Sequence, residues 1–175
     1  VIEAGKQALT DYGAGTTGSR VLNGTYQGHK DVEEALKEFY AMDHAMVFST
    51  GYQANLGIIS TIAGKGDYVI LDIDSHASIY DGCKLSYGKM LRYKHNDMED
   101  LEACLKKVPS TAGILIITDG VFRMGGDIAN LPAIVELAKK YNARVMVDDA
   151  HALGVIGKGG RGTASHFGLE NEVDI

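Results

Sequence analysis

The sequence predicts an α/β fold of three layers, in which helices cover both faces of a mainly parallel sheet. Strand-like and helix-like runs alternate along the chain with short connections, as expected for crossover helices between parallel strands. The strand-like run over 143–147 has no alternation of apolar and polar residues, which predicts burial on both faces. No repeat or low-complexity tract interrupts the pattern, so we expect a single domain over residues 1–175.

The first half of the chain contains three helical and three strand patterns. Residues 29–40 place Val32, Ala35, Leu36 and Phe39 on one face, which predicts a helix. A short apolar run over 45–49 predicts a strand, and a helix is expected over 55–62. The Tyr-Val-Ile-Leu run at 68–71 predicts a strand, 77–87 a helix and 90–93 another strand.

The second half continues the same alternation. Apolar residues at helical spacing predict a helix over 98–108, and the Gly-Ile-Leu-Ile-Ile run at 113–117 is the clearest strand pattern in the sequence. Pro132 fits the first turn of a helix over 131–141, because that position needs no backbone N–H. The run over 143–147 predicts the next strand.

Composition excludes several classes of protein. Hydrophobic residues make up 45% and charged residues 23%, which is ordinary for a soluble globular protein. A net charge of −6 and a pI near 5.4 argue against nucleic acid or an anionic membrane as the main partner. No apolar stretch is long enough for a membrane span. Cys83 and Cys104 have no metal-binding or redox spacing, which is consistent with a reducing cytoplasm.

Both ends of the sequence indicate a segment of a longer protein. The chain begins with Val1 instead of an initiator Met, and residues 173–175 resemble the first residues of another strand. We therefore expect a segment cut at both ends from a larger domain.

The most informative segment runs from Val145 to His151. A buried β-branched strand there delivers Asp148, Asp149 and an imidazole at its carboxyl end, where ligands bind in parallel α/β sheets. A buried Asp148 needs a cationic partner, and a protonated ring nitrogen would serve. Pyridoxal phosphate enzymes place an Asp opposite the pyridinium nitrogen of their cofactor. A capping Asp after a strand is an equally good interpretation of this segment alone.

Polar residues also follow other predicted strands. Gly51 and Tyr52 would begin a helix and offer backbone N–H groups to a phosphate, although an ordinary strand-to-helix turn explains them nearly as well. His76 could stack on a flat aromatic ligand, cap a helix, or bind a metal with neighbouring carboxylates. Residues 118–122 would line the same crevice.

Two glycine-rich motifs carry less weight. Residues 13–18 match the dinucleotide fingerprint Gly-x-Gly-x-x-Gly, but that fingerprint needs a strand before it and a helix after it. Here a helix-like run precedes and a loop-like run follows, which disfavours a dinucleotide site. Residues 157–162 form a basic glycine-rich loop that is either a surface turn or an approach to an anionic group.

The ordered set of motifs resembles the α-oxoamine synthases, which are fold-type I pyridoxal phosphate enzymes, and the resemblance covers nearly the whole chain. The stretches at 18–25 and 74–82 are most similar to bacterial members that use L-serine and a long-chain acyl-CoA in sphingolipid synthesis. Members that make 8-amino-7-oxononanoate, acetylate glycine or make aminolevulinate are close alternatives. The matching motifs are Gly-Ser-Arg-Val-Leu-Asn-Gly-Thr at 18–25, His29 with Glu33-Glu34, Ser-Thr-Gly-Tyr-Gln-Ala-Asn at 49–55, Asp-Ser-His-Ala-Ser at 74–78, Asp-Gly-Val-Phe at 119–122 and Asp-Asp-Ala-His at 148–151.

The resemblance implies part of the large domain of such a transferase, acting as a cytoplasmic homodimer. The reaction joins an amino acid, with L-serine favoured, to an acyl-CoA with decarboxylation and yields an α-amino ketone. Asp148 would pair with the pyridinium nitrogen, and His151 would bind the phenolic oxygen or the substrate. His76 would stack on the cofactor ring and could also steer the substrate carboxylate. Backbone N–H groups of Gly51 and Tyr52 would hold the phosphate. Asn55 would contact the substrate or support a residue that does.

Two departures from the family limit this transfer. Arg123 stands where the family usually has Ser, so the hydrogen bond of that Ser is lost and a contact with a substrate carboxylate is possible instead. The Schiff-base lysine is expected beyond Ile175, together with the C-terminal small domain. Because that lysine is the covalent anchor of the cofactor, we expect the segment alone to be inactive.

Readings from other classes remain open at this point. A metal-dependent hydrolase would use Asp72, Asp74, His76, Asp148 and His151, although their spacing fits no tight metal-binding pattern. A non-catalytic α/β domain that serves assembly would need none of these side chains. Bound metal, bound cofactor or neither would distinguish the three.

Overall fold

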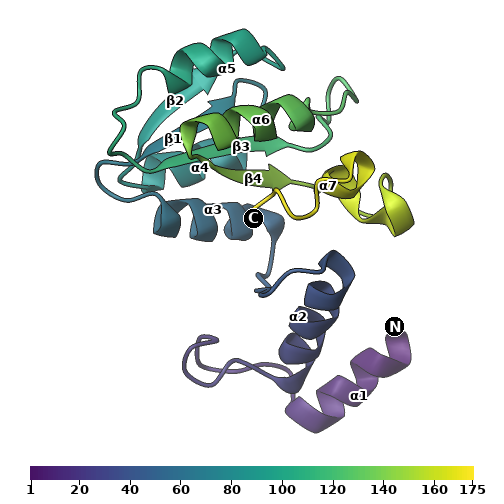
Figure 1. Ribbon diagram of the computed structural model, residues 1–175. Coiled ribbons are helices and arrows are strands. Elements are labelled where there is room, and N and C mark those ends of the chain that lie inside the picture. Colours follow the sequence, from purple (N-terminus) through teal and green to yellow (C-terminus); the bar gives the residue numbers. More distant parts are fainter. The chain divides into compact units, whose positions relative to one another are not determined.

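The computed structural model describes all residues from 1 to 175, and the chain divides into two compact units, Val1–Val47 and Phe48–Ile175 (Figure 1). The sequence predicted a single domain. The division follows from where apolar side chains are buried, because the helices of the first unit contain no buried residue. The fully buried members of both hydrophobic clusters lie between Ile59 and Met146. That residues 1–175 belong to one larger domain stays a prediction.

The first unit consists of α1 (Ile2–Tyr12), α2 (Gln27–Tyr40) and their connections. The predicted helix over 29–40 is confirmed and begins two residues earlier. Its start is stabilised by the Tyr26 backbone N–H, which donates to His29 Nδ1 at 3.0 Å. The helix ends where Ala41 adopts a left-handed conformation with φ of 54°.

The predicted strand over 45–49 is wrong, since the structure has no strand there. Side chains satisfy the backbone of this stretch instead. Glu33 Oε1 accepts the Val47 N–H at 2.9 Å, and Arg20 Nη1 donates to the Val47 carbonyl oxygen at 2.7 Å. Arg20 and Glu33 also pair with each other at 2.7 Å. An apolar pattern could not distinguish this arrangement from a strand.

The second unit is built on one parallel sheet of four strands in the order β2-β1-β3-β4. This confirms the predicted α/β class with a parallel sheet. The strand predictions over 68–71, 90–93, 113–117 and 143–147 are confirmed to within a residue at each end, apart from β3, which continues two residues further. The strands are β1 (Tyr68–Asp72), β2 (Lys89–Tyr93), β3 (Ile114–Asp119) and β4 (Arg144–Asp148).

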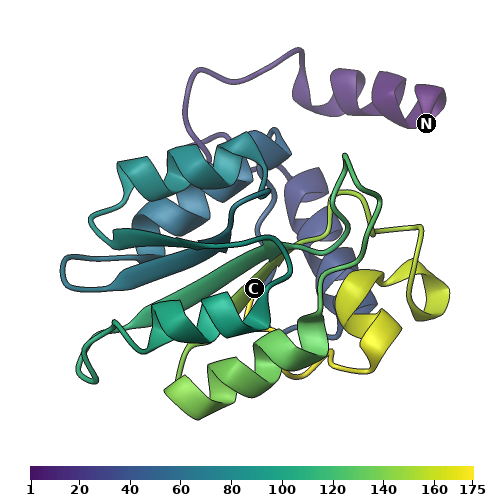
Figure 2. The ribbon, with the colours of Figure 1, turned by 90° about the horizontal axis from the view of Figure 1, so that it is seen from above.

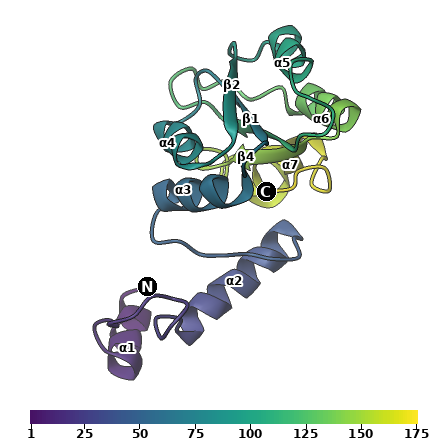
Figure 3. The same ribbon diagram turned by 90° about the vertical axis from the view of Figure 1, so that its left-hand side faces the viewer.

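Helices cover both faces of the sheet, as three layers require (Figures 2 and 3). Ile70, Ile116 and Val145 point to the face covered by α5 and α6, whereas their neighbours Leu71 and Ile117 point to the face of α3 and α4. All five side chains are at most 1% exposed. Burial of alternate residues on opposite faces explains why the central residues of β1 and β3 are apolar without alternation. The helices of these layers are α3 (Gly51–Ile62), α4 (Ala77–Leu85), α5 (Met98–Leu105) and α6 (Leu131–Tyr141).

The helices α3 to α6, which cover the sheet, start at side-chain caps. Thr50, Asp97 and Asn130 each accept a backbone N–H from the residue three positions later. Capping by Thr50 explains why α3 begins four residues before the predicted start. The predicted helices over 77–87 and 98–108 end two and three residues early, and the prediction for 131–141 is confirmed at both ends.

The last part of the chain is less regular. A 3₁₀ turn (Lys158–Gly160) and α7 (Gly162–Phe167) follow β4. Residues 173–175 form no strand, although the N–H groups of Asp174 and Ile175 both donate to the Val145 carbonyl oxygen. None of the helices has the length and apolar character that crossing a bilayer would need.

The direction in which strands are added to the sheet reverses between β1 and β3. The chain passes from β1 through α4 to β2 on one side of β1, and β3 and then β4 are added on its other side. The carboxyl ends of β1 and β3 therefore mark a topological switch point, the place where open α/β sheets bind ligands.

The central position of Ile116 gives a test of this core. Replacing Ile116, which is 0% exposed, by Ala should lower the free energy of unfolding by roughly 2–5 kcal/mol, since a cavity is left between the sheet and α6. Ile73, at 47% exposure, is the matched control, and Ile73→Ala should change it by no more than about 0.5 kcal/mol. Urea unfolding of the full-length protein that contains this chain measures both. Equal effects of the two substitutions would contradict the arrangement.

Candidate functional site

Three carboxylates end three neighbouring strands. Asp72, Asp119 and Asp148 are the last residues of β1, β3 and β4, and the register pairs Asp119 directly with Asp148. Asp72 is 0% exposed and Asp119 is 7% exposed. Buried carboxylates require hydrogen-bond donors, so the partners of each one define the site.

A hydrogen-bonded chain connects Asp148 to His76. Asn55, buried in α3, donates from Nδ2 to Asp148 Oδ2 at 2.8 Å and to Ser78 Oγ at 2.9 Å. Ser78 Oγ lies 2.7 Å from His76 Nδ1. Three predicted site residues, Asn55, His76 and Asp148, therefore come together from α3, the start of α4 and the end of β4. Both amide hydrogens of Asn55 are committed to protein groups, which favours a supporting role over contact with substrate.

Asp119 fixes the backbone of His76. The His76 N–H donates to Asp119 Oδ2 at 3.1 Å. Burial, and next the charge of Asp148, raise the pKa of Asp119 from 3.8 to about 6, against the opposing effect of this hydrogen bond. The loop after β1 is thus tied to the end of β3.

Asp148 and Asp149 point to different partners. Asp148 Oδ1 accepts the Ala150 N–H at 3.1 Å, whereas Asp149 accepts the N–H of Thr163 at 2.8 Å and its hydroxyl at 2.6 Å. Burial raises the pKa of Asp149, and the bonds from Thr163 oppose that shift. A Cβ atom on Gly120 would lie 2.0 Å from Asp149 Oδ1, so the carboxylate fits only because glycine stands there.

Gly51 and Tyr52 are the first two residues of α3, as a phosphate site at a helix N-terminus would require. The Tyr52 ring lies edge-on to the His76 ring, with centroids 6.2 Å apart, and its hydroxyl donates to Asp81. That hydrogen bond is the largest cause of a raised pKa of Tyr52, and burial and the charge of Asp81 add to it. No strand precedes these residues, contrary to the sequence analysis.

The two remaining predicted site residues, His151 and Arg123, are exposed. His151 follows β4 in a turn, and Arg123 lies in the turn of a small hairpin closed by a bridge between Val121 and Ile128. No hydrogen bond ties either side chain to the network around Asp148. Residues 157–162 form the 3₁₀ turn and its flanks, and Gly162 packs against Asp149 Oδ2.

Sequence reasoning missed a second network, centred on His95. Its Nδ1 lies 3.1 Å from Asp72 Oδ1 and 3.8 Å from Asp74 Oδ2, and its Nε2 lies 2.7 Å from Asp127 Oδ2. The Asn96 N–H donates to Asp72 Oδ2 at 2.9 Å. Burial alone would lower the pKa of His95, but its bonds to Asp72 and Asp127 raise it. The signal that could have revealed His95 is its position just after the strand that ends at Tyr93.

The structure does not support the metal-dependent hydrolase. No group of three or more His, Cys, Asp or Glu side chains in the chain could hold a metal ion. Asp72 is engaged by His95, whereas His76 and Asp148 face Ser78 and Asn55. The proposed metal ligands thus belong to separate networks.

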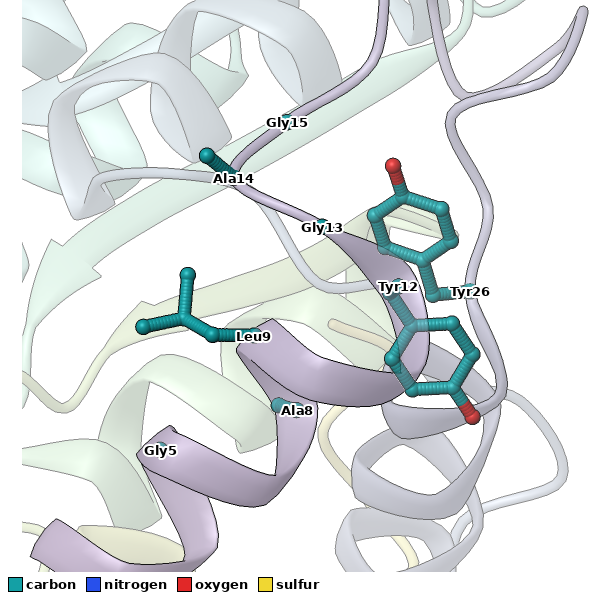
Figure 4. A pocket seen from close by; sticks show the side chains of 8 residues that line it. All are labelled: Gly5, Ala8, Leu9, Tyr12, Gly13, Ala14, Gly15 and Tyr26. Atoms are coloured by element: carbon teal, nitrogen blue, oxygen red, sulfur yellow. The ribbon is translucent and has the colours of Figure 1, made fainter.

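The first unit has an open, mainly apolar pocket of about 230 Å³ at the end of α1 (Figure 4). Tyr12 and Tyr26 stack beside it with centroids 5.0 Å apart. Gly13 and Gly15 of the glycine motif line it, but α1 precedes the motif where a dinucleotide site needs a strand. The pocket contains none of the predicted site residues.

A parallel sheet with a switch point, a helix N-terminus and a supported Asp at the end of β4 defines a domain of the fold-type I transferases. The chain belongs to the aminotransferase class I and II family, whose sequence model matches residues 1–175. Among its relatives, the serine palmitoyltransferases of Sphingomonas paucimobilis and Sphingobacterium spiritivorum are 54% and 53% identical over the whole chain, which covers 42% and 44% of their lengths. The 8-amino-7-oxononanoate synthase of Lysinibacillus sphaericus is 48% identical over 97% of the chain and 43% of that protein.

Solved structures agree with this assignment. Sphingomonas wittichii serine palmitoyltransferase matches with a TM-score of 0.95 and 60% identity over 99% of this chain and 43% of that one. The resemblance to α-oxoamine synthases and the predicted fold are therefore confirmed. The chain spans about two fifths of the length of these relatives.

The raised pKa of Asp119 predicts a pH-dependent effect of removing its charge. A carboxyl whose pKa is raised on folding contributes stability that is complete below about 3.8 and is lost as pH rises through about 6. Asp119→Asn removes the charge but keeps an acceptor for the His76 N–H. The free energy of unfolding of this variant, minus that of wild type, should therefore increase between pH 4 and pH 8 by up to roughly 3 kcal/mol. Urea unfolding of the cofactor-free full-length protein at both pH values measures this. Asp119→Ala is the control that loses charge and acceptor together, and it should be less stable than Asp119→Asn at both. A pH-independent effect of Asp119→Asn would contradict the burial of this charge.

The His95 network predicts that the contribution of His95 to the free energy of unfolding depends on pH, whereas that of a neutral contact would not. A histidine whose pKa is raised on folding contributes stability that is complete below its ordinary 6.5 and is lost as pH rises through the higher folded value. His95→Gln should therefore cost more stability at pH 5.5 than at pH 9. Asp127→Asn removes one of the two paired carboxylates and should reduce this pH dependence. The same cost of His95→Gln at both pH values would argue that the imidazole is not charged between the two carboxylates.

Proposed function

We propose that the full-length protein containing this chain is a pyridoxal phosphate-dependent acyltransferase that condenses L-serine with a long-chain acyl-CoA. The products would be an α-amino ketone, carbon dioxide and free CoA, as in the first step of sphingolipid synthesis. The observation that carries the proposal is the supported carboxylate of Asp148 at the end of β4, joined through Asn55 and Ser78 to His76. The names of the relatives, which are 53–54% identical over the whole chain, support the choice of substrates.

The residues present fit pyridoxal phosphate. Asp148 is an acceptor-only group at the ligand-binding edge of the sheet and can face a protonated ring nitrogen. The first two N–H groups of α3 have no acceptor within the helix, and the helix dipole favours an anion at Gly51 and Tyr52. One solved relative is described as serine palmitoyltransferase with pyridoxal phosphate as internal aldimine. When bound, the cofactor supplies the electron sink that stabilises negative charge on the substrate carbon.

The chain's own residues then have distinct tasks. Asp148 holds a negative charge opposite the ring nitrogen, and Asn55 keeps that carboxylate oriented. His76 presents a flat ring for stacking, since its backbone is fixed by Asp119. The exposed side chains of His151 and Arg123 are free to reach a polar group of the cofactor or a substrate carboxylate. The lysine that anchors the cofactor is predicted beyond Ile175.

The identity of the amino substrate has one supported alternative. The 48% identical 8-amino-7-oxononanoate synthase indicates that a member with another amino acid and acyl group is close in sequence. Action as a homodimer and a cytoplasmic location belong to the same proposal.

Absorption spectroscopy of the full-length protein tests both the cofactor and the substrate. The protein purified with pyridoxal phosphate should show a visible band, and L-serine should shift it at lower concentration than glycine or L-alanine. A shift with L-alanine alone would favour the 8-amino-7-oxononanoate synthase activity. No band in the loaded protein would overturn the proposal.

Replacing Asp148 tests the carrying observation. Asp148→Asn removes the charge opposite the ring nitrogen and should lower kcat for product formation about 10²–10³-fold, a typical loss for one electrostatic contact to the reacting group. Asp100→Asn is the control, because Asp100 lies on α5 and its carboxylate accepts the Lys94 N–H. An Asp148→Asn protein with more than half of the wild-type kcat would contradict the assignment.

A further inference from the structure

The hydrogen bonds around His76 determine which ring nitrogen carries the proton. The Ser78 backbone N–H donates to His76 Nδ1 at 3.2 Å. A backbone amide can only donate, so Nδ1 must be an acceptor and carries no hydrogen. The neutral ring therefore has its proton on Nε2, which makes no hydrogen bond within the chain.

The side chain of Ser78 supplies a second donor to the same nitrogen. Asn55 Nδ2 has two hydrogens, and its acceptors are Asp148 Oδ2 at 2.8 Å and Ser78 Oγ at 2.9 Å. The amide nitrogen of Asn55, and not its oxygen, faces Asp148 Oδ2, which fixes the orientation of Asn55. Ser78 Oγ accepts from Asn55, so its one hydrogen is available for His76 Nδ1, 2.7 Å away.

Burial makes this arrangement the only satisfied one. Ser78 is 1% exposed and Asn55 is 6% exposed, so water cannot readily replace a lost partner. If His76 carried its proton on Nδ1, the Ser78 backbone N–H would face another donor, and the hydrogen of the Ser78 hydroxyl would lose its acceptor. Buried groups left unpaired in this way are costly.

We propose that Asn55 and Ser78 are positioning residues that hold His76 as the Nε2–H tautomer and so present an N–H donor to the substrate. The charge of Asp148 orients Asn55, Asn55 orients the Ser78 hydroxyl, and Ser78 orients the imidazole. One carboxylate thereby organises both the group that faces the cofactor and the group that faces the substrate. The ligand of Nε2, an anionic or carbonyl oxygen of the amino acid, rests on the proposed function, whereas the tautomer does not.

Nitrogen NMR of the full-length protein, labelled with ¹⁵N-histidine, reads the tautomer directly. His76→Gln identifies the signals of His76 by their loss. In wild type, Nδ1 should have the shift of an unprotonated ring nitrogen and Nε2 that of a protonated one. Ser78→Ala and Asn55→Asp should move both shifts part of the way toward those of a tautomer mixture. The first leaves only the longer backbone N–H contact of 3.2 Å on Nδ1, and the second offers the Ser78 hydroxyl a competing carboxylate. A protonated Nδ1 in wild type, or unchanged shifts in both variants, would overturn the proposal.

Two further variants separate positioning from general packing. Ser78→Thr keeps the hydroxyl and should restore the wild-type shifts. Ser60→Ala is the control, since Ser60 lies on α3, the helix of Asn55, and its hydroxyl donates to the Leu56 carbonyl oxygen instead of the network around His76. Its shifts should equal those of wild type. Shifts in Ser60→Ala as large as those in Ser78→Ala would assign the effect to packing and overturn the proposal.

Binding of the amino acid distinguishes this proposal from the proposed function. In the cofactor-loaded full-length protein, Ser78→Ala should raise the Kd of the amino acid about three- to tenfold, the effect of one weakened hydrogen bond, while the cofactor band remains. Ser78→Thr should restore the affinity. An unchanged Kd in Ser78→Ala would contradict the role of the tautomer in substrate binding. If wild type itself shows no response to any amino acid, the proposed function fails, and the NMR result still decides the tautomer.

Discussion

The hydrogen bond from Asn55 to Asp148 is the interaction on which the site depends. Parallel strands that are buried on both faces can place charged groups only at their ends, and there the charge must find donors. Asp148 finds one on α3, so the helix covering one face of the sheet is tied to the end of β4. The same amide supports Ser78 and, through it, His76. Three elements are therefore held in register by one polar side chain.

The neighbouring carboxylates show how the fold accommodates so much negative charge at one edge. Asp72 is surrounded by donors from His95 and Asn96, so it stays buried without disturbing the others. Asp119 lies opposite Asp148 in the register, and burial, followed by the charge of Asp148, raises its pKa to about 6. Ionisation of Asp119 is therefore harder than for an ordinary Asp, and the edge of the sheet loses part of its negative charge as the pH falls toward 6. A cation at that position would be favoured.

Much of the fold could be predicted from the sequence, because buried strands and capped helices depend on local patterns. The runs that lead to Asp72, Asp119 and Asp148 are mainly apolar, and Pro132 marks the first turn of α6. The apolar run at 45–49 has the pattern of a strand but forms none, since Arg20 and Glu33, which are distant in sequence, bind the backbone of Val47. Motifs located His76 and Asp148, but the partners of each became visible only in three dimensions. The role of His95 could not be predicted, because its partners Asp72 and Asp127 are far from it and from each other in sequence.

The adjacent residues Asp148 and Asp149 have different structural roles. Successive side chains at the end of a strand point in different directions, so one carboxylate reaches Asn55 and the other reaches Thr163. The second contact closes the glycine-rich turn back onto β4, and it needs Gly120 and Gly162, where any Cβ would collide with Asp149. Asp149 therefore fixes the backbone from which both Asp148 and His151 project. The chemistry proposed for Asp148 relies on a neighbour that never faces the ligand, which explains why two acidic residues stand together where one would carry the charge.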